Sequence, residues 1–319
     1  MIDIPPHLMD VPTPILLDGG MSNALEDRGH DLSDPLWTAR LLRDAPGEIA
    51  AVHRDYFEAG AVVATTASYQ ASVQGWQAAG LTRDAAEKLI TSSVAIARSV
   101  RDELDGDGVR RWVAASVGPY GAVLADGSEY RGRYGLSASR LRDFHLPRIE
   151  LLASADPDFL AVETIPDLTE LEVLANLLDE LQIPAWLSVT IDGSRLRDGS
   201  DLSAALAVAA SPRSVFAVGV NCCAPADVQP AVELIHDTEL VQGTELVQGT
   251  RDRPAVCYPN SGQRWDEQSR SWVGPSGFDL RWAVDWVATG AAYVGGCCRV
   301  GAGEIAALRG RLIGSGGGR

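Results

Sequence analysis

The stretch "AAYVGGCCR" at residues 291–299 is an apolar run that ends in two glycines, two cysteines and an arginine. Seven earlier runs share this form, apolar at first and then small, polar or turn-forming: "PILLDGG" (14–20), "AVVATTASYQ" (61–70), "WVAASVGPYG" (112–121), "FLAVETIPD" (159–167), "AWLSVTIDG" (185–193), "VFAVGVNCC" (215–223) and "PAVCYPNSG" (254–262). Strands of parallel sheets are buried on both faces and read as continuous apolar runs of this kind. The eight runs therefore predict eight parallel strands.

Helical patterns lie between these runs. Thr82 is placed to cap a helix whose apolar residues recur at helical spacing as far as Leu104. Asp167 and Glu170 occupy the positions of a capping box ahead of leucines that share one face. Eight strands alternating with helices over 319 residues predict the α/β class and a single (β/α)8 TIM barrel. A doubly wound sheet is the alternative, but "LDGGMSN" lacks the G-x-G-x-x-G spacing of a dinucleotide-binding fold.

We expect one barrel domain over residues 1–319, with a flexible glycine-rich tail from about residue 314. The sequence "TELVQGTELVQGT" contains a six-residue duplication at 238–249, which falls between the sixth helix and the seventh strand. Connections there lie on the face away from the catalytic loops of a barrel, and insertions in them cost little free energy. We interpret the duplication as a tolerated insertion.

The composition excludes several classes of partner. The net charge of −16 and a pI near 4.7 argue against nucleic acids and anionic membranes, which bind basic patches. The start "MIDIPPHLMDVPTP" has no secretion signal, and no run approaches the roughly 18 apolar residues of a membrane span. Five cysteines, an odd number, do not suggest a secreted disulfide framework. We expect a cytoplasmic protein with reduced cysteines, and a monomer.

Two absences narrow the chemistry. Lys88, the only lysine, lies in a helical run far from any strand end, so no lysine is placed for a Schiff base. None of the five histidines follows an apolar strand-like run, which argues against histidine-ligated metals and Ser-His triads.

The cysteines are the strongest chemical signal. In a TIM barrel the active site lies at the C-terminal ends of the strands, where Cys222, Cys223, Cys297 and Cys298 all fall. Three thiolates there would form a soft site for zinc with Zn–S distances of ~2.3 Å and one open position. Neighbouring strand residues face opposite sides, so only one of Cys222 and Cys223 can share the metal, and the spacing does not choose between them. Cys257 lies within a strand and is expected to be a core residue.

The segments "GVNC" (219–222) and "GGCCR" (295–299) resemble those of the zinc-dependent homocysteine S-methyltransferases. The similarity extends over nearly the whole chain through "LLDGGMSNALEDRGHDLSDPLWTARLL", "TTASYQAS", "SVGPYGAVLADGSEYRG", "VETIPDLTELEVL" and "YPNSGQRWD". The compact enzymes that use S-methylmethionine are the most similar branch. One departure is "GGMSN" at 19–23, where relatives more often have a "GGLAT"-like run.

The resemblance implies a role for particular residues. The zinc ligands it implies are Cys222, Cys297 and Cys298, with Cys223 left as a neighbour. The substrate-binding residues it implies are Asp18, Gly19, Gly20, Glu163, Asn221 and Tyr69. Glu163 would receive the amino group of homocysteine, and the turn at Asp18–Gly20 would hold its amino-acid end. From the residues alone, a carboxylate at a strand end suits a cation, and the N–H groups of a Gly-Gly turn suit a carboxylate.

The function implied is transfer of a methyl group from a sulfonium donor to zinc-bound homocysteine, forming methionine. S-methylmethionine is the expected donor and S-adenosylmethionine a weaker second. Aromatic faces attract a soft cation, and five rings are expected near the barrel mouth: Tyr69, Tyr120, Tyr130, Tyr134 and Trp265. The acidic "DGSEY" at 126–130 would add a bias toward a cationic donor. A non-catalytic zinc-binding barrel and a redox sensor based on Cys297 and Cys298 are the alternatives, and the sequence does not distinguish homocysteine from selenocysteine as the acceptor.

Overall fold

The structure is a computed structural model of the chain. It describes residues 14–34, 36–237, 241–242, 245–246, 253–266, 271–275 and 277–314, and for 241–242, 245–246, 264–266 and 271–272 the course of the chain alone. The expected tail after residue 314 and most of the duplication at 238–249 lie outside these residues.

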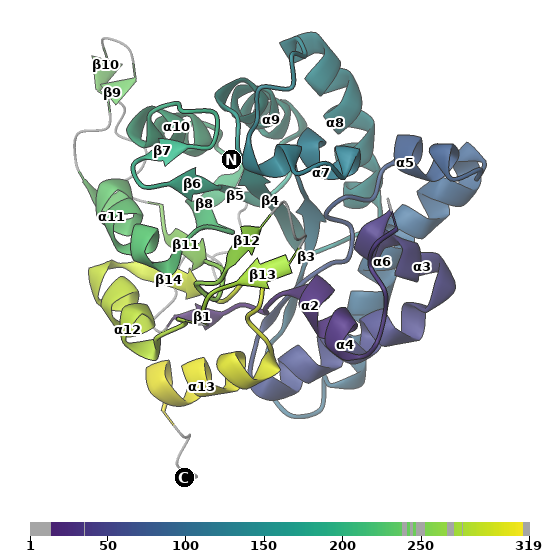
Figure 1. Cartoon of the computed structure of the whole chain (residues 1–319), viewed down its shortest axis with the longest axis horizontal. Helices are drawn as coiled ribbons and strands as arrows, with labels where there is room; N and C mark the ends of the chain where they lie inside the picture. The colour runs from purple at the N-terminus through teal and green to yellow at the C-terminus, as the bar shows by residue number, and fades with distance from the viewer. Residues whose placement is uncertain are drawn as a thin grey trace.

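Eight parallel strands form one sheet that curves into a barrel (Figure 1). They are β1 (Ile15–Leu16), β2 (Val63–Thr65), β3 (Trp112–Val117), β4 (Phe159–Ile165), β5 (Ala185–Val189), β8 (Val215–Asn221), β11 (Ala255–Tyr258) and β14 (Ala291–Val294). Their order in the sheet is β1-β14-β11-β8-β5-β4-β3-β2, and a parallel bridge between Leu17 and Val63 joins the two ends. The predicted (β/α)8 barrel is confirmed, and each predicted apolar run contains one of its strands.

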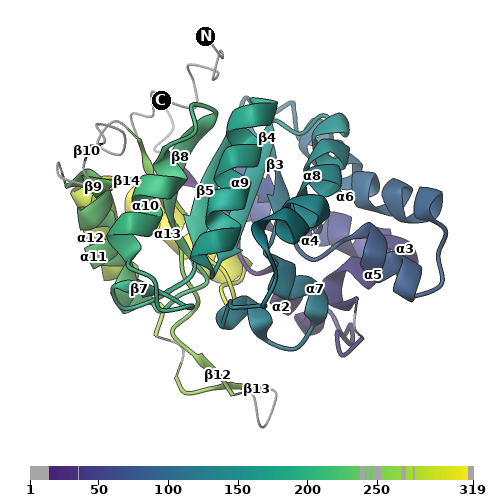
Figure 2. The same cartoon turned by 90° about the horizontal axis from the view of Figure 1, so that it is seen from above.

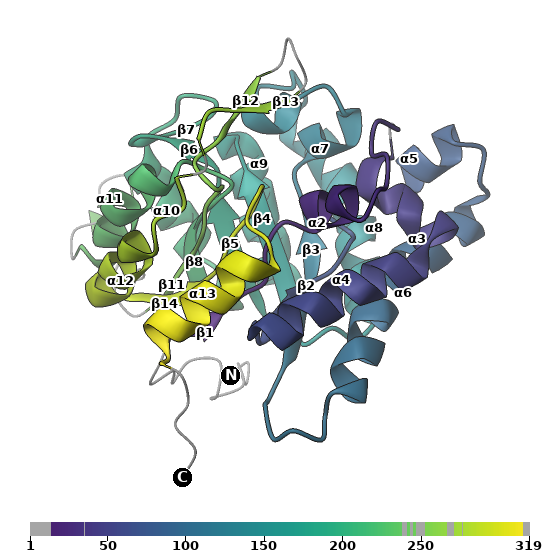
Figure 3. The same ribbon diagram turned by 60° about the horizontal axis from the view of Figure 1, so that its bottom comes forward.

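Helices surround the barrel. The longer ones are α4 (Pro46–Ala59), α6 (Arg83–Glu103), α8 (Ala138–Ser154), α9 (Leu168–Leu181), α10 (Leu202–Ala210), α11 (Pro225–His236), α12 (Leu280–Thr289) and α13 (Ala302–Leu312). The short ones are α2 (Met21–Asp27), η1 (Trp37–Ala39), α3 (Arg40–Asp44), α5 (Val73–Ala78), α7 (Tyr120–Leu124) and η2 (Ser128–Tyr130). Figure 3 shows α13 lying beside α4, and the two helices are in contact, which closes the helical ring where the ends of the barrel meet.

Three short hairpins complete the described elements. They are β6 (Ile191–Asp192) with β7 (Arg195–Leu196), β9 (Val241–Gln242) with β10 (Glu245–Leu246), and β12 (Arg264–Asp266) with β13 (Ser271–Val273). In Figure 2 the β12–β13 hairpin projects from the end of the barrel at which α2 and α7 also lie. Both α2 and α7 follow the C-terminal ends of strands, so this end is the mouth of the barrel.

The predicted helix starts are present, with one difference. Thr82 accepts a hydrogen bond from the Ala85 N–H, and Asp167 accepts one from the Glu170 N–H. The Glu170 side chain, however, does not close a capping box. It accepts hydrogen bonds from the Tyr120 N–H and the Tyr134 hydroxyl and lies 2.8 Å from His145 Nε2, because tertiary partners outcompete the local one.

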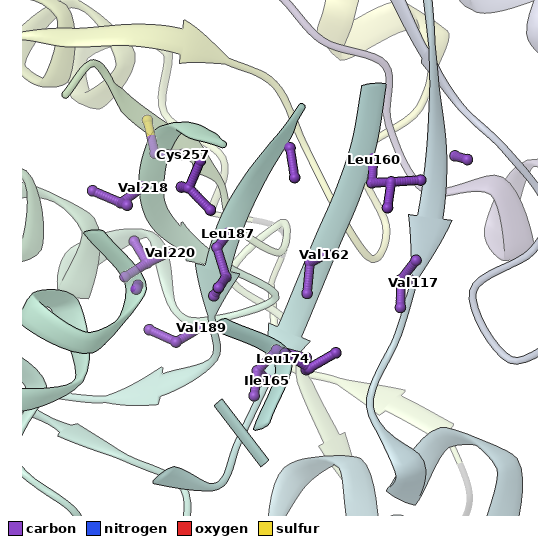
Figure 4. Close-up of a cluster of buried hydrophobic side chains, with 14 of the residues drawn as sticks. Val117, Leu160, Val162, Ile165, Leu174, Leu187, Val189, Val218, Val220 and Cys257 are labelled. Atoms are coloured by element: carbon purple, nitrogen blue, oxygen red, sulfur yellow. The ribbon is translucent and has the colours of Figure 1, made fainter. Parts of the chain in front are cut away.

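Two apolar clusters fill the barrel and its surroundings. The outer cluster lies between the strands and the helices, and Figure 4 shows part of it, including Val162, Leu187, Val218 and Cys257. Cys257 is fully buried there, as expected of a core residue. The inner cluster fills the barrel with aromatic rings: Phe159, Trp186, Phe216, Tyr258 and Tyr293. Phe159 lies with its ring centroid 5.1 Å from those of Trp186 and Phe216, within the usual range for aromatic pairs.

Alternation along the strands places polar side chains above this aromatic layer. Phe159 and Ala161 of β4 face inward, so the residue two further along, Glu163, faces inward as well. By the same alternation Ser116 follows Ala114 in β3, and Ser188 follows Trp186 in β5. The interior of the barrel therefore changes from apolar to polar at the C-terminal ends of its strands. Within the described residues, no helix is both long enough and apolar enough to cross a membrane.

A buried histidine in α4 predicts acid sensitivity. His53 is fully buried, and neither ring nitrogen has a hydrogen-bond partner among the described residues. Burial lowers the pKa of His53 to about 4, so the folded protein resists a proton that the unfolded chain accepts near pH 6.5. The stability contributed by the neutral ring is complete above pH 6.5 and declines as the pH falls toward 4, by up to about 3 kcal/mol.

We therefore expect His53→Leu to lose less stability than the wild type when the pH falls from 7.5 to 4.5, with a difference of about 2–3 kcal/mol. Denaturant unfolding of both proteins at the two pH values measures it. Equal losses in the two proteins would contradict the assignment.

Candidate functional site

A pocket opens at the mouth of the barrel. It encloses about 800 Å³, counting the part that is open to solvent. Its lining comes from the C-terminal ends of β2, β4 and β11 and from the segments after β1, β2, β3, β8 and β14: Asp18, Gly19, Gly20, Met21, Ser22, Asn23, Trp37, Thr38, Thr65, Thr66, Ala67, Tyr69, Gln70, Glu129, Tyr130, Glu163, Thr164, Cys222, Tyr258, Gly296, Cys297 and Cys298.

Three cysteine sulfurs converge on this pocket. The Sγ atoms of Cys222, Cys297 and Cys298 all lie within 4.8 Å of one another. Cys222 Sγ is 3.7 Å from Cys298 Sγ, and the sulfurs of the adjacent pair are 4.0 Å apart. The spacing allows one metal ion to contact all three.

The backbone explains how adjacent cysteines share one face. Cys297 and Cys298 follow β14 in a turn closed by the Val300 N–H, which donates to the Cys297 carbonyl. The loop after β11 fixes both residues, because Cys297 donates its N–H to the Pro259 carbonyl and Cys298 donates its N–H to Asn260 Oδ1. The strand rule that neighbours face opposite sides does not hold in such a turn.

Glycines bring this turn close to the first strand. A Cβ atom on Gly295 would lie 2.5 Å from Leu17 Cβ, and one on Gly20 would lie 2.6 Å from the Cys297 carbonyl oxygen. Both distances are shorter than real contacts allow, so the close approach of the two loops requires glycine.

The side chains of Cys222 and Cys223 point in different directions, so only one of them can share a metal ion with Cys297 and Cys298. Cys222 has φ of 51°, a left-handed conformation that bends the chain immediately after β8 and directs its side chain into the pocket. Cys223 is fully buried in the outer cluster between strands and helices. Burial raises the pKa of Cys223 well above its usual value, and the Asp227 carboxylate adds to the rise.

The three clustered thiols share charge unequally. The pKa of Cys222 lies well below its usual value because the other two thiols hydrogen-bond to its sulfur. The pKa values of Cys297 and Cys298 are raised, since each would have to ionise beside the Cys222 thiolate. A cation bound by all three sulfurs would offset the repulsion between neighbouring thiolates.

The Asp18–Gly20 turn differs from the expectation in one respect. Asp18 lines the pocket, and its carboxylate accepts hydrogen bonds from the N–H and the hydroxyl of Thr65. The Gly20 N–H donates to the Val300 carbonyl at 2.9 Å and so is not available to a substrate carboxylate. Burial raises the pKa of Asp18 to about 8 in spite of the Thr65 hydrogen bonds.

Glu163 is a second buried carboxylate of the pocket. It accepts a hydrogen bond from the Ser116 hydroxyl, and Tyr258 lies on its other side. Burial raises the pKa of Glu163 to about 7 in spite of these two hydroxyl groups. A register shift in the pairing of β4 with β5 and a left-handed Thr164, with φ of 62°, mark a bulge at this point of the strand.

Asn221 does not reach the pocket, contrary to the expectation that it binds substrate. It is fully buried, and its Oδ1 accepts hydrogen bonds from the Thr164 N–H and the Ser188 hydroxyl. Its amide nitrogen donates to Thr164 Oγ1 at 2.6 Å. The side chain thus holds the strained Thr164 next to Glu163, and its contribution is to position that carboxylate.

The five predicted aromatic rings separate into groups. Tyr69 and Tyr130 line the pocket, and the Tyr130 hydroxyl lies 3.4 Å from Cys222 Sγ. Tyr120 and Tyr134 are not among the lining residues, because they pack on each other with ring centroids 5.4 Å apart. The side chain of Trp265 is outside the described residues.

A buried arginine holds the loop that carries Tyr69. Arg148 of α8 donates to the carbonyl of Ser68 at 2.8 Å, to that of Gly118 at 2.9 Å, and to that of Tyr69. These bonds tie the loop after β2 to the loop after β3, so the pocket wall is fixed from behind.

A model of the homocysteine S-methyltransferase family matches residues 15–312, from the first residue of β1 to the last of α13. The homocysteine S-methyltransferase of Escherichia coli is 41% identical over 95% of this chain and 97% of its own. The selenocysteine Se-methyltransferase of Brassica oleracea var. italica is 38% identical over 93% of this chain and 88% of its own.

The chain belongs to the homocysteine S-methyltransferase family.

A solved homocysteine S-methyltransferase has the same fold. The crystal structure of the Escherichia coli homocysteine methyltransferase MmuM in its metallated form superimposes with a TM-score of 0.82 at 40% identity, covering 96% of this chain and 98% of that one.

Several pocket residues of this family member were not identified from the sequence. Trp37 is the first residue of η1 and has φ of 47°, a left-handed conformation that is rare for a bulky residue. Tyr258 could have been found from the strand alternation, since it lies two residues beyond the inward-facing Val256. The same alternation places Ser116 and Ser188 where they hydrogen-bond to the pocket residues Glu163 and Tyr258. Glu129 was noticed only as part of an acidic segment, and it proves to be a pocket carboxylate.

Proposed function

We propose that the protein is a zinc-dependent methyltransferase that moves a methyl group from a sulfonium donor, S-methylmethionine, to homocysteine. The convergence of three cysteine sulfurs within 4.8 Å at a deep pocket carries this proposal. Membership of the homocysteine S-methyltransferase family supports it.

Zinc suits the donor set. Three thiolates around tetrahedral zinc, at ~2.3 Å from the metal, lie about 3.8 Å apart, and two of the sulfur separations here are 3.7 Å and 4.0 Å. Such a zinc ion would hold the sulfur of homocysteine as a thiolate at neutral pH. No histidine or lysine is needed as a separate base.

Homocysteine would lie between the cysteines and two carboxylates. Asp18 and Glu163 both line the pocket; burial raises the pKa of both carboxyl groups, and the described lining provides no cation beside either of them. The ammonium group of an amino acid would supply that cation and donate to both carboxylates. The Brassica relative is named for selenocysteine, which also carries an ammonium group, so this contact does not separate the two acceptors.

The remainder of the pocket suits a cationic donor. The described lining contains three carboxylates, Asp18, Glu129 and Glu163, and neither lysine nor arginine. Trp37, Tyr69 and Tyr130 add aromatic rings, whose faces attract cations by about 0.5–2 kcal/mol each. A sulfonium leaves as a neutral thioether, so the residues of the chain need only align the methyl group with the attacking sulfur.

Methylation of homocysteine with a panel of donors tests the proposal, with zinc measured on the same sample. We expect one zinc ion per chain, the highest kcat/KM with S-methylmethionine, a lower one with S-adenosylmethionine, and the lowest with betaine and methyltetrahydrofolate. Zinc without thiol methylation would instead indicate a non-catalytic zinc-binding barrel. Loss of thiols on mild oxidation in a metal-free protein would indicate a redox sensor.

A further inference from the structure

One carboxylate of the pocket has an oxygen atom without a hydrogen-bond partner among the described residues. Glu129 lies in η2, the single turn between α7 and α8, and lines the pocket together with Tyr130. Its Oε2 atom is buried and has no hydrogen-bond partner among the described residues. A buried carboxylate oxygen without a partner costs free energy, so a group that binds to it would recover that loss.

The turn that carries Glu129 is held in place independently of any ligand. Asp126 accepts a hydrogen bond from the Ser128 N–H at 2.9 Å, and the Ser128 carbonyl accepts one from the Gly132 N–H. Gly121 permits the turn to pack on α7, since a Cβ atom there would lie 2.5 Å from the Glu129 nitrogen. The backbone position of Glu129 in the pocket wall is therefore set by the protein itself.

The charge of Arg131 acts on this carboxylate and lowers its pKa, against the larger rise that burial causes. The printed hydrogen bonds of the Arg131 guanidinium group go to the Asp126 carbonyl and the Ser128 hydroxyl, and the described pocket lining contains no lysine or arginine. A cationic group of a ligand in the pocket would therefore find Glu129 Oε2 free to accept a hydrogen bond.

We propose that Glu129 binds the α-ammonium group of the methyl donor and so selects sulfonium donors that are amino acids. This inference rests on the proposed function. Two amino-acid substrates bring two ammonium groups, and Asp18 and Glu163 are assigned to that of homocysteine. Glu129 is the one remaining carboxylate of the described lining, and its neighbour Tyr130 contacts the cysteine cluster through Cys222.

The ammonium group suits Glu129 better than the sulfonium does. A sulfonium has no N–H to donate, whereas an ammonium group donates up to three hydrogen bonds. The sulfonium also loses its charge as the methyl group leaves, so a carboxylate against it would stabilise the bound donor more than the transition state. The ammonium charge is the same before, during and after transfer, and Glu129 would therefore act on donor binding rather than on the chemical step.

Glu129→Gln tests the inference with two donors. S-methylmethionine has the ammonium group, and dimethylsulfoniopropionate has a sulfonium and a carboxylate without it. For S-methylmethionine we expect the donor KM to rise about tenfold or more, with kcat at saturation nearly unchanged. For dimethylsulfoniopropionate we expect no change in kcat/KM, or in its inhibition constant against S-methylmethionine if it is not turned over. The zinc content and the homocysteine KM should stay as in the wild type.

Glu172→Gln is the matched control, because it removes the same charge from an exposed position on α9. Equal losses with both donors, a raised homocysteine KM, or no change at all would each overturn the inference. If the wild type used no sulfonium donor, the proposed function would fail together with it. If the wild type used S-methylmethionine and the variant did so equally well, the inference alone would fail.

Discussion

Cys298→Ala is expected to abolish both zinc binding and methyl transfer, and Cys222→Ala and Cys297→Ala are expected to do the same. Each substitution removes one of three sulfurs that lie within 4.8 Å of one another. The two sulfurs that remain are too few protein ligands to hold a metal ion tightly. Removal of a residue that only hydrogen-bonds to a metal ligand typically costs 10- to 100-fold in metal affinity, and the loss of a direct ligand should exceed that. Zinc per chain and initial rates on the same preparations measure both effects.

The chain supplies its own controls. Cys223 is adjacent to Cys222 but is buried in the outer cluster, and Cys257 is buried in that cluster as well. Cys223→Ala and Cys257→Ala should therefore keep the metal and the activity, with at most a modest loss of stability. Full zinc content in Cys298→Ala would refute the three-sulfur site, and loss of zinc in Cys223→Ala would mean that the wrong neighbour has been assigned.

The barrel could be predicted from the sequence because its signal is repeated. A parallel strand buried on both faces gives a continuous apolar run, and every one of the eight runs contains a strand. Such runs do not depend on which strands pair. The exact bounds of each strand do depend on the pairing. For example, β1 is only two residues long because the chain leaves the sheet at Asp18 to form the pocket.

The position of the cysteine cluster was also predictable, because strand ends meet at one mouth in any TIM barrel. The choice of Cys222 over Cys223 was not predictable from spacing. It depends on the left-handed conformation of Cys222, which tertiary contacts impose: its N–H donates to the Tyr258 carbonyl, and its carbonyl accepts from the Thr190 hydroxyl. The resemblance to the family supplied what the local pattern lacked.

The contacts of other site residues could not be predicted from the sequence, because a hydrogen-bond partner far along the chain decides what each one does. The Gly20 N–H is taken by the carbonyl of Val300, and the amide of Asn221 by Thr164. No residue within a few positions of Gly20 or Asn221 in the sequence indicates these partners. The unpaired state of Glu129 likewise follows from what surrounds it in the fold rather than from its neighbours in "DGSEY".

Glu163→Gln is expected to weaken the use of homocysteine without loss of zinc. The carboxylate lies two residues beyond Ala161 on the inner face of β4 and accepts a hydrogen bond from Ser116. It lines a pocket whose described lining contains no lysine or arginine. Its proposed partner is the ammonium group of homocysteine, and a hydrogen bond to a charged group is worth about 1.5–3 kcal/mol. The expected loss in kcat/KM for homocysteine is therefore roughly 10- to 150-fold, carried mainly by KM.

A thiol without the amino group separates this contact from a structural role. The wild type should prefer homocysteine over 4-sulfanylbutanoate, and Glu163→Gln should lose most of that preference, because the variant has no charge with which to recognise the ammonium group. Ser116→Ala is the matched control: it removes a hydrogen bond to the same carboxyl group but keeps the group itself, which a bound ammonium group still holds in its ionised form, so the preference should persist. If Glu163→Gln weakened both thiols equally, the glutamate would be acting through the shape of the barrel mouth, and the recognition of the amino group would have to be assigned to Asp18 alone.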